Sequence, residues 1–387
     1  MQDKMIISGM GSLSALGSNS EEIWKHYQDE TTRITNCCFN ELDTPVGKLY
    51  PEDENLISKL REEKSHYKRL DKTVLLGILA GRKAFKQASW KEDENVSINL
   101  GSSRGATQLF EKYHKNFVTN DEKRLSALVS PTTTLGNISS WLAYDLGVKG
   151  ASFSHSITCS TALHSVLNAI AWLQSGMAEK FLVGGSEAPL SDFTIAQMRA
   201  LKIYAEKSDS FPSLPLQKDK HRSSLVLGEG AAVFCMERDQ GQNRIAKIAG
   251  VGYATELIEH NVSLSAEAEC LQKSMKMALK NANLTSVDSI VMHAPGTLRG
   301  DQSEYKAIQK LFGKELPHII STKYTTGHTF GASGALSMEL AILMLQHQKT
   351  IKLPYESESC GDPKSLENIM VNATGFGGNA VSIILSK

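Results

Sequence analysis

Short apolar runs rich in β-branched residues alternate along the chain with longer segments whose apolar residues recur at helical spacing. The short runs predict strands at residues 4–9, 96–100, 181–184, 231–237 and 289–293. The periodic segments predict helices at residues 20–27, 68–88, 265–281 and 301–312. This alternation is typical of an α/β protein with buried sheets.

The pattern starts again near residue 244, after a polar, breaker-rich stretch at residues 240–243. We therefore expect two halves, residues 1–240 and 241–387. In the first, Cys159 precedes a predicted helix that runs to about residue 176, and in the second, His328 precedes one that runs to about residue 346. This shared arrangement favours an internal duplication, although no residue-level identity is visible.

The overall composition narrows the function classes. The 387 residues carry 42 basic and 42 acidic side chains, so a chain-wide attraction to nucleic acid or an anionic membrane is not expected. The sequence contains no run of 18 apolar residues, so a membrane-spanning helix is not expected. The N-terminus does not resemble a secretory signal. The six cysteines form no CxxC pair, which disfavours a zinc site or a disulfide framework and favours the cytoplasm.

The segment around Cys159 is the first that suggests chemistry. A strand-like stretch enters it and an amphipathic helix leaves it, so the sulfur is expected at a helix N-terminus. Free N–H groups and the helix dipole there favour thiolate, the nucleophilic form. The alternative is that Cys159 is a small buried apolar residue, as most cysteines are.

Two further segments each set a histidine among small residues, between a predicted strand and a predicted helix. These are His293 and His328, the second of which follows Lys323 by five residues. Ligands often reach the backbone at glycine-rich turns of this kind. Either histidine could instead be structural. A metal site made of both histidines and Cys159 is disfavoured, because nothing supplies a second shell.

The ordered set of these motifs resembles the β-ketoacyl-[acyl carrier protein] synthases, the condensing enzymes of the thiolase superfamily. The resemblance covers nearly the whole chain. It extends through residues 6–17, the Cys159 motif, residues 228–231, the His293 and His328 motifs, and the Gly-Phe-Gly-Gly loop at residues 375–378. It implies the five-layered αβαβα thiolase fold, built from two duplicated halves.

The resemblance also implies roles for individual residues. Cys159 would attack an acyl thioester and hold the chain, while the backbone N–H groups of Cys159 and Phe376 would form the oxyanion hole. His293 and His328 would bind malonyl thioester and stabilise the enolate that forms on loss of CO₂. Lys323 would tune the histidines, although its alternative is an ordinary surface lysine.

Several positions depart from the family pattern around the substrate. Thr297 keeps one of two threonines that contact the phosphopantetheine arm, and Pro295 replaces the other. In the C-terminal loop, Thr374 replaces a phenylalanine, whereas Phe376 and Gly377 are kept as gate and substrate-binding residues.

A further departure concerns an acidic residue near Lys323. The family usually has glutamate nine residues after the second histidine, where this chain has Ser337, with Glu339 two residues further on. Whether Glu339 compensates is left open. These changes suggest a specialised enzyme, such as an aryl-polyene or other polyketide paralogue.

The implied partner is an acidic acyl carrier protein that brings its own 4′-phosphopantetheine, so we expect no cofactor bound to the enzyme itself. Two basic groups resemble the family's docking surface, and the alternative is an ordinary solvated helix face. Their members are Lys64, Lys68, Arg69, Lys72, Lys123 and Arg124. A homodimer is the default expectation, with a heterodimer with a paralogue as an alternative.

Three functions therefore stand side by side. The first is a decarboxylating Claisen condensation of malonyl-carrier with an acyl group on Cys159. The second is a non-condensing acyltransferase that uses the same cysteine. The third is a non-catalytic, chain-shaping subunit of a heterodimer, which is disfavoured because Cys159, His293, His328 and Lys323 are all present. No Walker A motif, dinucleotide fingerprint or Gly-x-Ser-x-Gly elbow appears.

Overall fold

The structure is a computed structural model that describes residues 5–92, 95–120, 124–135, 137–206, 210–240, 243–257, 264–356 and 363–387. In this part of the chain, ten strands form one large sheet in the order β11-β10-β12-β13-β9-β1-β8-β6-β4-β5. Five come from the N-terminal half: β1 (Met5–Leu13), β4 (Val96–Gly101), β5 (Ser152–Phe153), β6 (Lys180–Glu187) and β8 (Gly230–Arg238). Five come from the C-terminal half: β9 (Ala246–Thr255), β10 (Ser289–Val291), β11 (His318–Ile320), β12 (Asn368–Gly375) and β13 (Asn379–Ser386).

The two halves of the sheet repeat one topology. Counted along the chain within each half, the strands lie in the order third, second, fourth, fifth, first. The first strands, β1 and β9, pair antiparallel and join the halves. The same topology on both sides of this junction supports a duplication.

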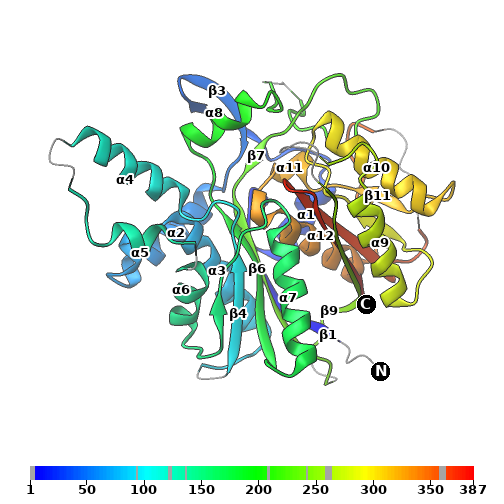
Figure 1. Cartoon of the computed structure of the whole chain (residues 1–387), viewed down its shortest axis with the longest axis horizontal. Coiled ribbons are helices and arrows are strands. Elements are labelled where there is room, and N and C mark those ends of the chain that lie inside the picture. Colours follow the sequence, from blue (N-terminus) through cyan, green and yellow to red (C-terminus); the bar gives the residue numbers. More distant parts are fainter. Residues whose placement is uncertain are drawn as a thin grey trace.

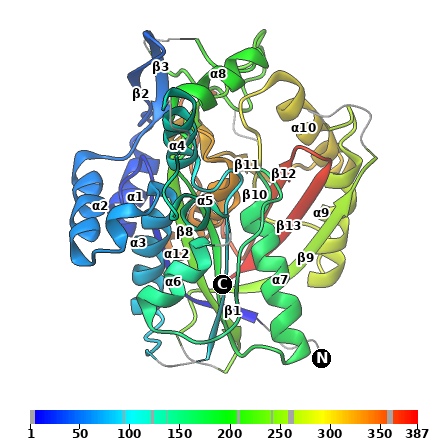
Figure 2. The ribbon, with the colours of Figure 1, turned by 60° about the vertical axis from the view of Figure 1, so that its left-hand side comes forward.

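Helices form three layers around these two half-sheets (Figures 1 and 2). The inner layer consists of α7 (Thr161–Ser175) and α12 (Ser333–His347), which pack on each other and on the inner sheet faces. Outside the N-terminal half lie α3 (Lys72–Gln87) and α6 (Asn137–Leu146), and outside the C-terminal half lie α9 (Glu269–Ala282) and α10 (Leu298–Phe312). The expected five-layered αβαβα arrangement is thereby confirmed.

The remaining described elements cover the edges and the approach to the centre. The helices are α1 (Ser20–Gln28), α2 (Pro51–Glu63), η1 (Tyr67–Arg69), α4 (Thr107–Thr119), α5 (Val129–Thr133), α8 (Asp192–Ala200), α11 (Lys323–Thr326) and η2 (Phe330–Ala332). A small second sheet contains β2 (Thr35–Phe39), β3 (Leu42–Gly47) and β7 (Leu227–Gly228). No helix among the described residues is long and apolar enough to cross a membrane.

The strands are apolar on both faces because both faces are covered by helices. On β8, Phe234 and Met236 belong to the inner core around α7 and α12, whereas Val233 and Cys235 belong to the outer core under α3. Alternate side chains of the strand thus pack into two separate cores, one on each face of the sheet.

A repeated glycine pattern links the first strand of each half to its covering helix. Residues 7–11 and 248–252 both have the pattern Ile-x-Gly-x-Gly. A Cβ atom on Gly9 would lie 2.3 Å from a carbonyl oxygen of α3, and one on Gly250 would lie 2.3 Å from a carbonyl oxygen of α9. Only glycine permits these close strand–helix contacts. The two halves therefore do share residue-level identity at these positions, and the expectation that none is visible is wrong here.

The expected elements are present with shifted bounds. The helix expected from residue 68 begins at Lys72, after the short helix η1, and the helix expected from residue 265 begins at Glu269. The strand expected at residues 289–293 ends at Val291, so His293 lies in the loop that follows.

Candidate active site

Cys159 lies on a tight turn between the stretch after β5 and the start of α7. Thr158 has a left-handed backbone with φ of +46°, which is uncommon for a β-branched residue and marks local strain. The turn is closed by the backbone N–H of Ser160, which donates to the Ile157 carbonyl at 3.2 Å. Cys159 is 6% exposed and directly precedes the helix N-terminus, as the sequence predicted.

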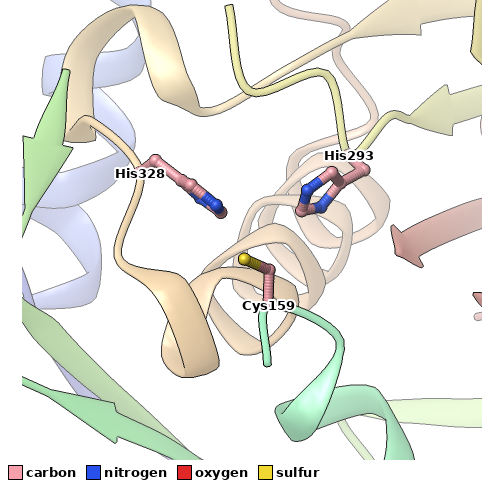
Figure 3. Close-up of side chains that lie close together, drawn as sticks. All are labelled: Cys159, His293 and His328. Atoms are coloured by element: carbon pink, nitrogen blue, oxygen red, sulfur yellow. The ribbon is translucent and has the colours of Figure 1, made fainter. Parts of the chain in front are cut away.

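The two histidines approach the sulfur from the other half of the molecule. His293 follows β10, and His328 lies between α11 and η2, where its backbone N–H donates to the Val226 carbonyl at 2.6 Å. The ligating atoms of Cys159, His293 and His328 all lie within 4.8 Å of one another. Both rings point toward the sulfur (Figure 3), and their centroids are 5.2 Å apart.

Burial determines the charge state of this group. It raises the pKa of Cys159 to about 12, with a further increase from Glu187 that Lys323 and Arg104 offset only in part. Burial, together with Lys323, lowers the pKa of His328 to about 3 and places that of His293 well below its ordinary value. The expected resting thiolate is therefore wrong: loss of solvation outweighs the helix N-terminus, and a neutral thiol faces two neutral imidazoles.

Lys323 is buried beside this group and is no surface lysine. It is 1% exposed, and its Nζ donates to the Met292 carbonyl at 3.5 Å and to Ser337 Oγ at 3.2 Å. Burial lowers its pKa to about 8, although the carboxylate of Glu304 acts in the opposite direction. A positive charge is thus held at the back of the histidine pair.

Glu339 does not replace the family's glutamate beside Lys323. Its carboxylate accepts a hydrogen bond from Ser12 on β1, on a different side of α12 from Ser337. A shift of two positions turns a side chain by about 200° around a helix, which explains why Glu339 faces elsewhere.

Two acidic residues that the sequence analysis did not select hold the His293 loop in place. Glu304 on α10 accepts the backbone N–H of His293 at 3.0 Å. Asp301, one turn earlier, accepts the N–H of Gly296 at 3.0 Å and pairs with Lys220 at 2.5 Å. Their place in the first turns of a helix directly after the histidine motif was the available signal.

A cavity of about 460 Å³ opens onto the reactive group. Its wall is largely apolar, and it includes Cys159, Met198, Leu201, Ile203, Leu225, His293, Pro295, Thr297, Arg299, His328, Phe330, Thr374 and Phe376. Thr297 caps α10, where its Oγ1 accepts the N–H of Gly300. Thr297 and Phe376 therefore both line the cavity that contains Cys159.

The Gly-Phe-Gly-Gly loop packs directly against the nucleophile turn. The Phe376 carbonyl accepts a hydrogen bond from Thr158 Oγ1 at 3.3 Å, and a Cβ atom on Gly375 would lie 3.0 Å from the Cys159 nitrogen. Phe376 is 37% exposed at the cavity wall. Gly377 lies next to it in the same turn, with φ of +99°, and is not among the described residues that line the cavity.

Three buried polar atoms at the cavity have no hydrogen-bond partner within the described part of the chain: His293 Nδ1, His328 Nδ1 and Thr374 Oγ1. Such atoms are costly unless a ligand or water satisfies them. Histidines that ligate a metal usually donate their second nitrogen to a carboxylate or carbonyl, and neither ring does so here. Cys159, His293 and His328 could converge on a metal, but they fit a polar organic ligand better.

The residues of the expected docking groups lie in different surroundings. Lys68 and Arg69 are exposed, Lys64 lies over the ring of Tyr144 at 4.7 Å, and Arg124 is exposed. Lys72 is directed inward, with Nζ 2.8 Å from a carboxylate oxygen of Glu229 and a side chain that is only 12% exposed. Lys123 lies outside the described residues.

Comparisons with known proteins agree with this geometry. The family model for the N-terminal domain of beta-ketoacyl synthases matches residues 2–241, and the model for the C-terminal domain matches residues 245–354. The curated 3-oxoacyl-[acyl-carrier-protein] synthase 2 of Staphylococcus aureus (strain COL) is 27% identical over 409 aligned residues, which cover 99% of this chain and 98% of the relative.

Solved structures show the same fold. A type II PKS acyl-carrier protein in complex with its ketosynthase, bound to the hexaketide, gives a TM-score of 0.86 at 18% identity, with all of both chains covered. A ketosynthase in complex with its chain length factor, from Xenorhabdus doucetiae, gives 0.79 at 22% identity and covers 99% of this chain and 98% of the other.

Proposed function

Since the chain belongs to the β-ketoacyl synthase family, we propose that it is a 3-oxoacyl-[acyl carrier protein] synthase of fatty acid or polyketide biosynthesis. One observation supports this most directly. A buried thiol and two neutral imidazoles from opposite halves of the molecule converge at the wall of one apolar cavity. This arrangement suits the formation of an acyl thioester followed by stabilisation of an enolate.

The first half-reaction is acyl transfer to Cys159. The sulfur attacks the thioester carbonyl while a neutral imidazole, that of His328 in this proposal, takes the thiol proton. The S–C bond to Cys159 forms, the bond to the pantetheine sulfur breaks, and the proton passes to the departing thiolate. The N–H groups of Cys159 and Phe376 stabilise the oxyanion between these steps.

The second half-reaction consumes malonyl-carrier. N–H groups of His293 and His328 bind its thioester oxygen, the bond to the carboxylate breaks, and CO₂ leaves an enolate. The enolate carbon attacks the acyl-Cys159 carbonyl, a C–C bond forms, and the cysteine thiolate leaves and takes a proton from water. The charged Lys323 behind the histidines favours the negatively charged intermediate.

The partner follows from the function of the relatives. In this proposal an acyl carrier protein in the cytoplasm delivers both substrates on its own phosphopantetheine arm, and the enzyme needs no bound cofactor. Lys68, Arg69 and Lys64 form the docking surface in the described residues, together with Arg124, and Lys72 is left out because it is paired inside the fold. Lys123 remains a proposed docking residue.

We also propose a dimer. Helix α4 has no buried residue among those described, and it carries Phe110 and Val118, which are 61% and 56% exposed. Exposed apolar side chains gathered on one element are typical of a protein interface. A second copy of this chain is the proposed partner, and a paralogue would leave the single chain monomeric in solution.

The test uses the wild-type protein with acyl-carrier and malonyl-carrier thioesters. Intact-protein mass spectrometry should find the acyl group on Cys159, and malonyl-carrier should then give CO₂ and a 3-oxoacyl-carrier product. An adduct without CO₂ release would indicate the non-condensing acyltransferase. The absence of both the adduct and CO₂ release would overturn the proposed function.

A further inference from the structure

Arg104 places a half-buried positive charge over an aromatic ring at the wall of the cavity that contains Cys159. It lies in the loop between β4 and α4, and its guanidinium carbon stands 5.1 Å from the centre of the Phe330 ring. Phe330 lines the cavity together with Cys159. The electrostatic influence of Arg104 reaches the Cys159 sulfur, where it lowers the thiol pKa.

The position of Arg104 is fixed by Glu187, which is fully buried. One carboxylate oxygen of Glu187 accepts the backbone N–H of Arg104 at 3.0 Å, and the other accepts the N–H of Gly331 at 3.0 Å. Since Gly331 follows Phe330, one carboxylate holds both the arginine loop and the aromatic residue that the arginine covers. The pairing of cation and ring is thus built into the fold.

The guanidinium keeps hydrogen-bonding capacity in this place. Its Nη1 donates to Gln197 Oε1 at 2.6 Å, and no carboxylate pairs with the side chain in the part of the chain that the structure describes. Burial lowers the pKa of Arg104, although the charge of Glu187 acts in the opposite direction. A guanidinium has five N–H donors, so it can bind a further oxygen.

The surrounding wall is apolar and suits the body of an acyl chain. Ile195, Met198 and Phe330 pack around Cys159 in one cluster. Gln197, the partner of Arg104, is next to Met198 on α8. A chain that starts at Cys159 and follows this wall passes Phe330, the ring over which the Arg104 guanidinium lies.

We propose that Arg104 makes the enzyme select acyl chains that carry a hydrogen-bond-accepting oxygen, a ketone or a carboxylate, toward their far end. The proposal rests on the proposed function, because it assumes an acyl group on Cys159. A plain alkyl chain that ends beside Arg104 removes water from the guanidinium and returns no hydrogen bond. An oxygenated chain supplies the acceptor.

The test measures single-turnover acylation of Cys159 by mass spectrometry, with acyl-pantetheines of six and eight carbons that end in a methyl group, a methyl ketone or a carboxylate. The wild-type protein should react with oxygenated chains about ten- to a hundredfold faster than with the methyl-ended chain of equal length, the range expected for a hydrogen bond to a charged group. The ketone and carboxylate arms distinguish a neutral acceptor from an anion.

Arg104→Met should abolish this preference, and Arg104→Lys should keep the preference for the carboxylate. Arg199→Met is the matched control, because Arg199 also donates to a neutral oxygen, that of Thr44, and lies over an aromatic ring, that of Tyr204. It should retain the wild-type preference.

Adducts that form equally fast with all three chain ends in the wild-type protein overturn this inference and leave the proposed function intact. So does an Arg104→Met variant with the wild-type preference. If Arg104→Met does not fold, the wild-type and Arg104→Lys rates decide. No adduct with any thioester overturns the proposed function and this inference together.

Discussion

The two halves of the molecule share one scaffold and supply different chemistry. In each half, the chain enters an inner helix after the third strand: α7 after β5 and α12 after β11. Neither helix has a side-chain cap at its N-terminus in the described part of the chain. Both helices pack on each other, so duplication brings two equivalent helix starts to one place.

The difference between the halves lies in what precedes each inner helix. The N-terminal half has one strained turn that carries Cys159, whereas the C-terminal half inserts α11 and η2, with His328 between them. One half thus presents a buried thiol, and the other presents two imidazoles and a buried cation, Lys323. The duplicated fold thus brings different chemical groups from its two copies to one place.

Substitution of Cys159 and of His328 should affect the two half-reactions differently, and this is the largest expected effect. Cys159→Ala should form no acyl adduct at this position, because alanine has no sulfur to acylate, while it still releases CO₂ from malonyl-carrier. His328→Ala should lose CO₂ release by about 10²–10⁴-fold and should also slow acyl transfer, because its imidazole takes the thiol proton. The two rates are measured separately, by acyl-adduct formation and by CO₂ evolution.

Cys38→Ala is the matched control for Cys159→Ala, because Cys38 is an exposed cysteine. This variant should behave as the wild-type protein. A Cys159→Ala variant that releases no CO₂ would contradict the assignment of CO₂ release to the two histidines.

The glycine pattern should make the two halves equally intolerant of a methyl group. Gly9→Ala and Gly250→Ala should each lower the free energy of unfolding by about 3 kcal/mol, because the new Cβ would meet the backbone of α3 or α9. Gly176→Ala is the control, since it has a left-handed backbone with φ of +77°, and the added carbon would make only an ordinary contact, 3.7 Å from Arg238 Nη2. It should cost only about 1–2 kcal/mol. Denaturant unfolding measures all three, and a strongly unequal effect of the two strand variants would weaken the equivalence.

Lys323 should lower the free energy of unfolding although it favours the condensation reaction. Lys323→Met should raise the free energy of unfolding at pH 7 by about 2 kcal/mol, because it removes a charge that burial disfavours more than Glu304 favours it, while condensation falls. Lys276→Met, an exposed change on α9, should alter neither.

The pH dependence has a definite sign. Below about pH 8, Lys323 is charged in both folded and unfolded chains, and its burial costs stability in full. Between pH 8 and its ordinary value of 10.5, the unfolded chain binds more protons, so wild-type stability should rise relative to Lys323→Met. If the difference in free energy of unfolding between the wild-type protein and Lys323→Met does not change with pH, titration of Lys323 is not the source of the pH dependence.

The smallest effect is expected at the surface. Lys68→Glu with Arg69→Glu should raise KM for the acyl-carrier substrate about tenfold, and less at high salt, because these exposed charges meet an acidic partner. Lys273→Glu with Lys276→Glu places the same charge change on α9 of the other half. Equal KM changes for the two pairs would show that docking does not favour the N-terminal half.

Local pattern was sufficient for the order of elements and for the reactive residues. The strand–helix alternation predicted the α/β class, and the small residues around Cys159, His293 and His328 pointed to three loops that the structure brings together. Long helices such as α3 and α9 were found with shifted starts, because end positions depend on caps and neighbouring turns.

Properties that depend on burial could not be predicted from the chain alone. A helix N-terminus favours thiolate, yet the pKa of Cys159 lies at about 12 because the sulfur is enclosed by both halves. In the same way, Lys72 belonged to a basic run in the sequence but pairs inward with Glu229. Glu339 could be placed relative to Lys323 only once the faces of α12 were known.

The sequence by itself determined which chemical groups this protein has and in which order, because motif identity and hydrophobic period are local properties. Only the tertiary structure decided which groups meet, which are charged and which face the cavity. Solvation and distance between residues more than a hundred positions apart depend on how the two half-sheets close around α7 and α12. The net charge of zero is a property of the whole chain. The charge that acts on Cys159 depends on where the fold places Lys323 and Arg104.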